Sequence, residues 1–179
     1  MLHLKWTAPG RVPSYQGGDP LPEPGEWTST VTNPVLCQRG WHACRWEDAA
    51  YHIAAELWVC ELGGKIVEGP DKVAGESLRL VRQVPITAGQ WRHWAADCAE
   101  QVLPVFEARF PGDARPRRAI QAARDFADGR IATEELAAGA AWAAGAARAT
   151  RVAEAARQSA ALLTRLGLNP DDFAHRSAT

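Results

Sequence analysis

The spacing of apolar residues changes at Pro85, and this change limits the folds that the chain can adopt. Before Pro85 apolar side chains alternate, as at Leu78, Leu80 and Val84, which is the period of a half-buried strand. After Pro85 they recur every three or four residues, which is the period of a helix with one buried face. The sequence therefore predicts an α+β protein with a small strand-rich module containing one short helix at residues 1–85, an alanine-rich antiparallel helical bundle at 86–174 and a disordered tail at 175–179.

Turn-forming residues divide the first module into short elements. The many prolines and glycines between residues 9 and 34 exclude a helix and predict an extended loop. Gly63-Gly64 predicts a two-residue hairpin, and Gly69-Pro70-Asp71 predicts another turn. Around these turns we expect strands at 2–6, 41–44, 57–62, 65–68 and 76–84, and a short helix at 46–55.

Capping signals set the limits of the predicted helices. Thr87 and Gln90 form a capping-box pattern, so the first helix begins there. Pro104 is expected to kink or end it. The remaining limits are Pro116 and Gly129 for a second helix, and Thr133 and Gly167 for a third.

The segment 138–149 is rich in alanine, which favours a helix and lets neighbouring helices approach closely. A tight seam inside the bundle explains this composition better than a dedicated partner surface. If the segment instead contacts a partner, or a second copy of the chain in a homodimer, the interface candidates are Trp142, Arg148 and Arg151.

Charge and composition narrow the function classes. The net charge is −1 and the pI is about 6.5, which argues against nucleic acid or an anionic membrane as the partner. The first residues lack the apolar stretch of a signal peptide, and no apolar run reaches the roughly 18 residues of a membrane span. We therefore expect a cytoplasmic protein whose four cysteines are reduced.

The segment 41–44 is the first candidate for a binding site. Because side chains alternate along a strand, Trp41 faces one side while His42 and Cys44 face the other. We expect Trp41 to be buried and His42 to lie beside Cys44, where an imidazole can donate, accept or titrate near neutral pH. The alternative is that His42 only pairs with a backbone carbonyl of the 9–34 loop. Since eight tryptophans also indicate a core or a binding platform, the full set of candidates is Trp41, His42, Cys44, Trp27 and Arg39.

Metal binding and cysteine catalysis are the weaker alternatives for the same residues. Cys37, His42, Cys44 and Cys60 carry atoms that zinc prefers, but their spacing fits no standard zinc site. A nucleophilic pair of His42 with Cys37 or Cys44 lacks a recognisable third group to orient the histidine. The sequence therefore predicts no metal, no cofactor and no catalytic residue.

The first module resembles a domain of unknown function that is widespread in phage and prophage proteins. The resemblance covers about residues 2–84 and rests on a Cys-x-x-Gly-aromatic-His-Ala-Cys pattern, a strand that ends in glycine and an Asp-Lys-Val-x-Ala strand. In this chain the matching segments are 37–44, 56–64, 71–74 and 78–82, together with 4–6 and 24–27.

The second module is similar to a helical domain of bacterial immunity-protein type. The residues that carry this similarity are 94–107 and 115–124. Related chains often have longer alanine–tryptophan repeats where this one has residues 138–149. The two resemblances imply a phage or mobile-element context and supply no established reaction.

Two hypotheses of different classes follow. The favoured one is an anti-defence or immunity-like protein that binds a bacterial or phage protein, or a small ligand, and catalyses nothing. The alternative is a small enzyme in the first module, either nucleotide-binding or similar to ADP-ribosyltransferases, in which a strand with Gly-aromatic-His lines the nicotinamide pocket. Its catalytic glutamate would have to be Glu61, Glu68 or Glu76.

Overall fold

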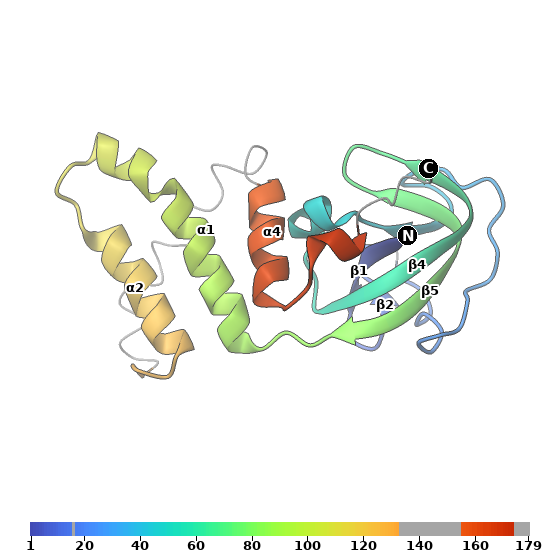
Figure 1. Cartoon of the computed structure of the whole chain (residues 1–179), viewed down its shortest axis with the longest axis horizontal. Helices are drawn as coiled ribbons and strands as arrows, with labels where there is room; N and C mark the ends of the chain where they lie inside the picture. The colour runs from blue at the N-terminus through green and yellow to red at the C-terminus, as the bar shows by residue number, and fades with distance from the viewer. Residues whose placement is uncertain (16, 133–154, 174–179) are drawn as a thin grey trace. The chain divides into compact units, whose positions relative to one another are not determined.

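A computed structural model describes residues 1–15, 17–132 and 155–173 of the chain. These residues form an α+β fold, as predicted, in which an antiparallel five-stranded sheet precedes the main helices (Figure 1). The chain divides into two compact units. Unit 1 comprises Met1–Ile86 and Ala155–Thr179, and unit 2 comprises Thr87–Glu154.

The sheet of unit 1 has the strand order β2-β1-β4-β5-β3. Its strands are β1 (Leu2–Ala8), β2 (Val12–Pro13), β3 (Trp41–Ala43), β4 (Glu56–Glu68) and β5 (Val73–Val84). Just after β3, Cys44 bridges back to β1, where it exchanges two backbone hydrogen bonds of 2.8 and 2.9 Å with Leu4. Strands β1, β4, β5 and β3 therefore close on themselves, and no long sheet edge is left between β3 and β1.

The predicted hairpin at Gly63-Gly64 is wrong. Strand β4 runs through both glycines, with a register shift against β5 between Gly63 and Ile66. Gly64 has a φ of +71°, so it bends the strand as a bulge instead of reversing it. The chain reverses later, at the turn predicted for residues 69–71, where the Gly69 N–H donates to the Lys72 carbonyl at 2.8 Å.

Gly40, the residue before β3, lies where the backbone has a positive φ and passes close to Pro34. Its φ is +106°, and a Cβ added there would lie 2.8 Å from the Cβ of Pro34. Only glycine fits this conformation and this space. The predicted turn before Trp41 is therefore confirmed, and it fixes where β3 starts.

The described part of unit 2, residues 87–132, contains two helices that form an antiparallel hairpin, α1 (Ala88–Arg109) and α2 (Arg115–Ala127) (Figure 1). The capping box is confirmed, because the Gln90 N–H donates to Thr87 Oγ1 and the Thr87 N–H donates to Gln90 Oε1. Helix α1 continues through Pro104, so this proline does not end it. Between α1 and α2 the small core consists of Ala96, Ala99, Leu103 and Ile120.

The last described helix, α4 (Ala155–Arg165), belongs to unit 1, whereas the sequence placed it in the bundle. It packs on the 3-10 helix η1 (Trp46–Tyr51), which replaces the longer helix expected at 46–55. Leu162 and Leu163 are fully buried, and the Ala50 N–H donates to Ser159 Oγ at 3.0 Å. The helical period was predicted correctly, but period alone does not reveal which element a helix packs against.

Several predictions concern residues outside the described ranges. These are the start of a helix at Thr133, the alanine-rich segment 138–149, the interface candidates Trp142, Arg148 and Arg151, and the tail at 175–179. The short turn after Gly167 is present as the 3-10 helix η2 (Pro170–Phe173). No helix in the described residues is long and apolar enough to cross a membrane.

The buried Ser159 provides a test of how α4 is held. Ser159→Ala leaves the Ala50 N–H without its acceptor, so we expect the free energy of unfolding to fall by about 1–3 kcal/mol. Urea denaturation followed by tryptophan fluorescence measures this change. Thr164→Ala is the matched control, because the Thr164 hydroxyl is exposed and donates only within its own helix. Equal stabilities of the two variants would contradict the role of Ser159.

Candidate functional site

A cavity of about 290 Å³ opens in unit 1 where β1 and β3 diverge beyond the Leu4–Cys44 bridge. One wall is formed by residues 4–6 of β1. A second wall is formed by residues 42–44, which are the last residues of β3 and the cysteine that follows it. The other walls come from Pro13, Tyr15, Cys37, His52 and Lys72. Its lining includes two lysines, two histidines and no carboxylate.

Lys5 places an ammonium group at the base of this site. Its Nζ donates to the His42 carbonyl at 2.7 Å, and the described residues include no carboxylate paired with it. Burial lowers the pKa of Lys5, although the nearby thiols of Cys60 and Cys44 act in the opposite direction. Among the described residues, Lys5 thus has a backbone carbonyl as its hydrogen-bond partner and no carboxylate as a counter-ion.

His42 is fixed by the loop that precedes β3. The Cys37 N–H donates to Nε2 of His42 at 2.9 Å, so the proton of the neutral ring belongs on Nδ1. Nδ1 is buried and makes no well-aligned hydrogen bond, although the backbone of Gly40 lies close enough to raise the pKa in part. Burial and the charges of Lys5 and Lys72 outweigh that effect, so the pKa of His42 is lowered. The expected partner, a carbonyl of the 9–34 loop, is therefore incorrect.

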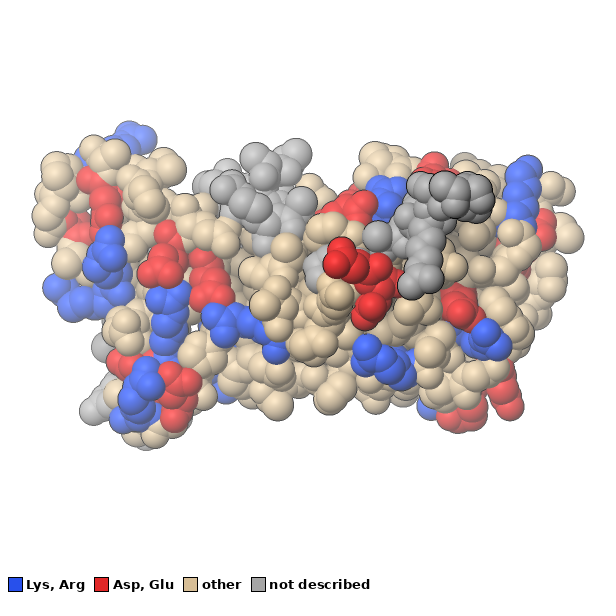
Figure 2. Space-filling view, viewed as in Figure 1, with Lys and Arg blue, Asp and Glu red and all other residues tan. Residues whose placement is uncertain are grey.

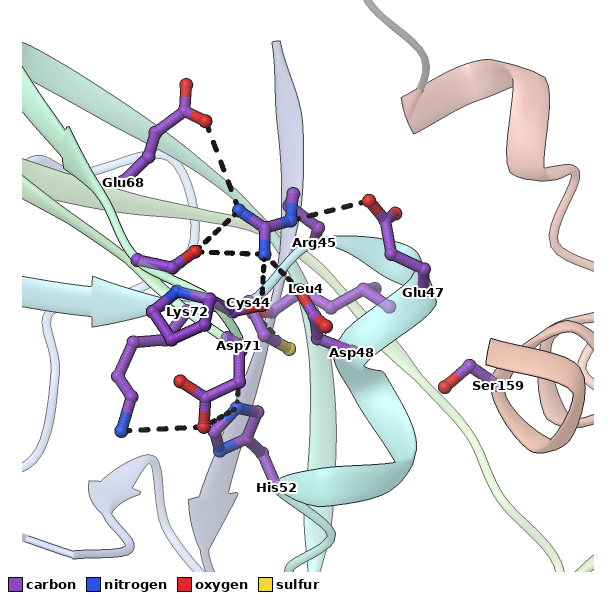
Figure 3. A network of polar contacts seen from close by, with 12 residues as sticks. Leu4, Cys44, Arg45, Glu47, Asp48, His52, Glu68, Asp71, Lys72 and Ser159 are labelled. Atoms are coloured by element: carbon purple, nitrogen blue, oxygen red, sulfur yellow. Dashed lines mark hydrogen bonds and ion pairs between the residues drawn. The ribbon is translucent and has the colours of Figure 1, made fainter. Parts of the chain in front are cut away.

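The wall that contains Lys72 is held in place by Arg45, which precedes η1 and contacts the 69–72 turn (Figure 3). Arg45 donates to the carbonyls of Gly69 and Pro70 and forms an ion pair with Asp48 at 2.8 Å. Burial raises the pKa of Asp48, and Arg45 opposes that rise. This network holds the turn that presents Lys72 to the cavity.

Lys72 is shared between a thiol and a carboxylate. Its Nζ lies 3.7 Å from Asp71 Oδ2, and its ammonium also interacts with the side chain of Cys37. Burial would lower the pKa of Lys72, but these two partners outweigh it and the pKa is raised. Because its pKa is raised, Lys72 is charged at neutral pH. The same turn also contacts His52, whose Nε2 lies 2.7 Å from the Asp71 carbonyl (Figure 3).

The thiols at the site differ in accessibility. Cys44 is buried and its Sγ lies 3.4 Å from the Leu4 carbonyl, and burial raises its pKa well above the usual range. Burial also raises the pKa of Cys60 to about 12. Cys37 is exposed and lines the cavity. Cys44 and Cys60 are thus inert thiols, and Cys37 is the accessible one.

The structure brings together only part of the predicted site. His42 and Cys44 line the cavity, while Trp41 packs on the core cluster that contains Ala43. The cavity lining does not include Trp27, whose ring lies 4.8 Å from the Arg79 guanidinium, or Arg39, which donates to the Asn33 carbonyl. Within the described residues no group of three or more His, Cys, Asp or Glu side chains is arranged to hold a metal, so Cys37, His42, Cys44 and Cys60 do not converge.

The glutamates considered for catalysis also lie outside the cavity lining. Glu61 forms an ion pair with Arg79, and Glu68 lies at the end of β4 beside Arg45. Glu76 accepts a hydrogen bond from the Asn33 N–H at 3.4 Å. None of them is placed to act on a molecule bound near His42.

Sequence reasoning missed Lys5, Lys72 and His52 as site residues. Isolated lysines and histidines are usually solvated surface residues, and closure of the sheet is what gathers these three. The available signal was indirect, because Leu4-Lys5-Trp6 and Asp71-Lys72 both belong to the segments that resemble the phage-associated domain.

The comparisons with known proteins concern mainly the helical part. Residues 88–163 match a family model described as "Imm-5 like putative immunity protein". The match covers less than half of the chain and spans α1, α2 and most of α4. It supports the similarity to immunity proteins expected for the second module. No curated protein and no solved structure matches the chain.

The lowered pKa of His42 predicts how stability depends on pH. Between its folded pKa and about 6.5, the unfolded chain binds a proton that the folded chain does not, so acidification favours unfolding. We expect the free energy of unfolding to fall as the pH is lowered from 7.5 to 5.5. Urea titrations of the wild type and of His42→Gln measure the part that His42 contributes. A steeper fall in the variant than in the wild type would contradict this assignment.

Proposed function

We propose that this chain is an immunity-like protein of a phage or another mobile element, which acts by binding a protein partner and not by catalysis. The observation that carries the proposal is the family match of residues 88–163. The phage context rests on the resemblance of the first module to a phage-associated domain. We place the proposed partner surface on unit 2, because of how the charged and apolar side chains of α1 and α2 are arranged.

Ion pairs across unit 2 occupy most of its charged side chains. Arg124 pairs with Asp97 at 2.9 Å and with Glu100 at 2.7 Å, and Arg117 pairs with Glu107 at 2.8 Å. Figure 2 shows basic and acidic side chains interspersed over α1 and α2. Such paired charges hold the hairpin together, and on the face of α1 and α2 seen in Figure 2 neither sign of charge predominates.

Two large apolar side chains are exposed near the end of α1, and we propose that they form the centre of the partner surface. Val105 is 74% exposed and Phe110 is 48% exposed. The Arg109 guanidinium lies 5.7 Å from the Phe110 ring, so a cation borders this surface. Exposed apolar side chains beside an arginine are typical of the centre of a protein interface. The expected partner surface is apolar with an acidic group at its edge.

Substitution at the most exposed of these residues tests the proposal. Bacteria that express the full chain are challenged with a panel of phages and with secreted protein toxins, and survival is counted against an empty vector. We expect the wild type to protect against at least one challenge. Val105→Glu should abolish that protection while leaving the melting temperature unchanged, because the Val105 side chain contributes little to the core.

Val81→Glu is the matched control, because Val81 is also exposed, at 42%, but lies on β5 of unit 1. We expect this variant to protect as the wild type does. The proposal fails if the wild type protects against none of the challenges. The assignment of the surface fails if Val105→Glu protects fully, or if the control loses protection equally at an unchanged melting temperature.

A further inference from the structure

We propose that the cavity between β1 and β3 binds a small molecule that combines a phosphate group with a planar ring, the class to which mononucleotides belong. This inference concerns unit 1 and is independent of the partner surface proposed for unit 2. It rests on three observations: the charges of Lys5 and Lys72, the hydrogen bonding of His42, and the aromatic and apolar side chains that line the cavity.

The first argument is charge. Lys5 and Lys72 enter the cavity lining from different segments, and no aspartate or glutamate lines it. Asp71 pairs with Lys72, whereas none of the described carboxylates pairs with Lys5. A buried cation without a counter-ion is costly unless an anion compensates it. A phosphate bound beside Lys5 would supply that compensation.

The second argument is the polar geometry around His42. Its Nε2 accepts from the Cys37 N–H, which leaves Nδ1 as the donor. That atom is buried and lacks a well-aligned acceptor among the described residues. Burial lowers the pKa of His42, and the positive charges of Lys5 and Lys72 lower it further. An anion in the cavity would oppose the effect of the two lysines and raise that pKa.

The third argument concerns the planar group. Tyr15 lines the cavity although its side chain is 75% exposed. Its ring meets His52 edge-on, with 6.4 Å between the ring centroids. Trp6 and Pro13 add apolar surface to the same lining. Pockets for small organic ligands commonly combine such apolar walls with a few fixed polar groups, and about 290 Å³ is close to the lower limit of their volumes, about 300 Å³.

Isothermal titration calorimetry on the full chain tests the inference. The probes are the four common ribonucleoside monophosphates, the matching nucleosides and inorganic phosphate. We expect at least one monophosphate to bind, and its nucleoside and inorganic phosphate to bind at least tenfold more weakly. Binding of the nucleoside with equal affinity would show that the phosphate is not recognised, and the inference would be wrong. Absence of binding by all four monophosphates would also overturn it.

Two variants locate the binding site. Lys5→Met keeps the length of the side chain and removes its charge, and it also removes the cost of burying an ammonium group, so the variant should fold. Lys72→Met provides the same test if Lys5→Met does not fold. We expect each to weaken monophosphate binding at least tenfold. Lys65→Met is the control, because Lys65 is exposed on β4 and lies outside the cavity lining. Unchanged affinity in both cavity variants, or an equal loss in the control, would overturn the assignment.

Discussion

The two backbone hydrogen bonds between Leu4 and Cys44 decide the form of unit 1. They join the first strand of the chain to the segment after β3, although forty residues separate them in sequence. This bridge closes the sheet, and β1 and β3 diverge immediately beyond it. The cavity is therefore a direct result of the closure, since one pair of residues both ends the pairing and positions Lys5 below His42. A flat sheet of the same strands would place these two side chains on separate edges.

The polar groups around the cavity differ in how many hydrogen-bond and ion-pair partners they have. Arg45 has several partners, which together fix the 69–72 turn and hence Lys72. Among the described residues Lys5 has one carbonyl, that of His42, as its hydrogen-bond partner, and its burial works against its charge. Proteins tolerate such an uncompensated group at a site where function requires it, and elsewhere usually replace it. Arg45 has several polar partners, whereas Lys5 has few. We infer from this contrast that the burial of Lys5 at the cavity lowers the folding stability of unit 1.

Local signals in the sequence predicted local structure well. Thr87 and Gln90 located the start of α1, and Gly40 located the turn before β3, because each acts through its immediate neighbours. Gly63-Gly64 misled, because a glycine pair permits both a hairpin and a bulge, and the pairing of β4 with β5 decides between them. Long-range facts were not predictable: α4 packs on η1, and Lys5 meets His42 across the bridge, through contacts that no periodicity encodes.

The division of the chain into units has a consequence for its synthesis. Unit 2 is inserted between β5 and α4, so unit 1 is completed only by residues that follow Glu154. On a ribosome the sheet emerges before unit 2, yet Ser159, Leu162 and Leu163, which are buried in unit 1, are made after unit 2. The nascent sheet must therefore persist with η1 uncovered while all of unit 2 is translated. Such an order exposes an apolar surface for several seconds at ordinary elongation rates of about 5–20 residues per second, and unit 1 can complete its packing only after α4 has been made.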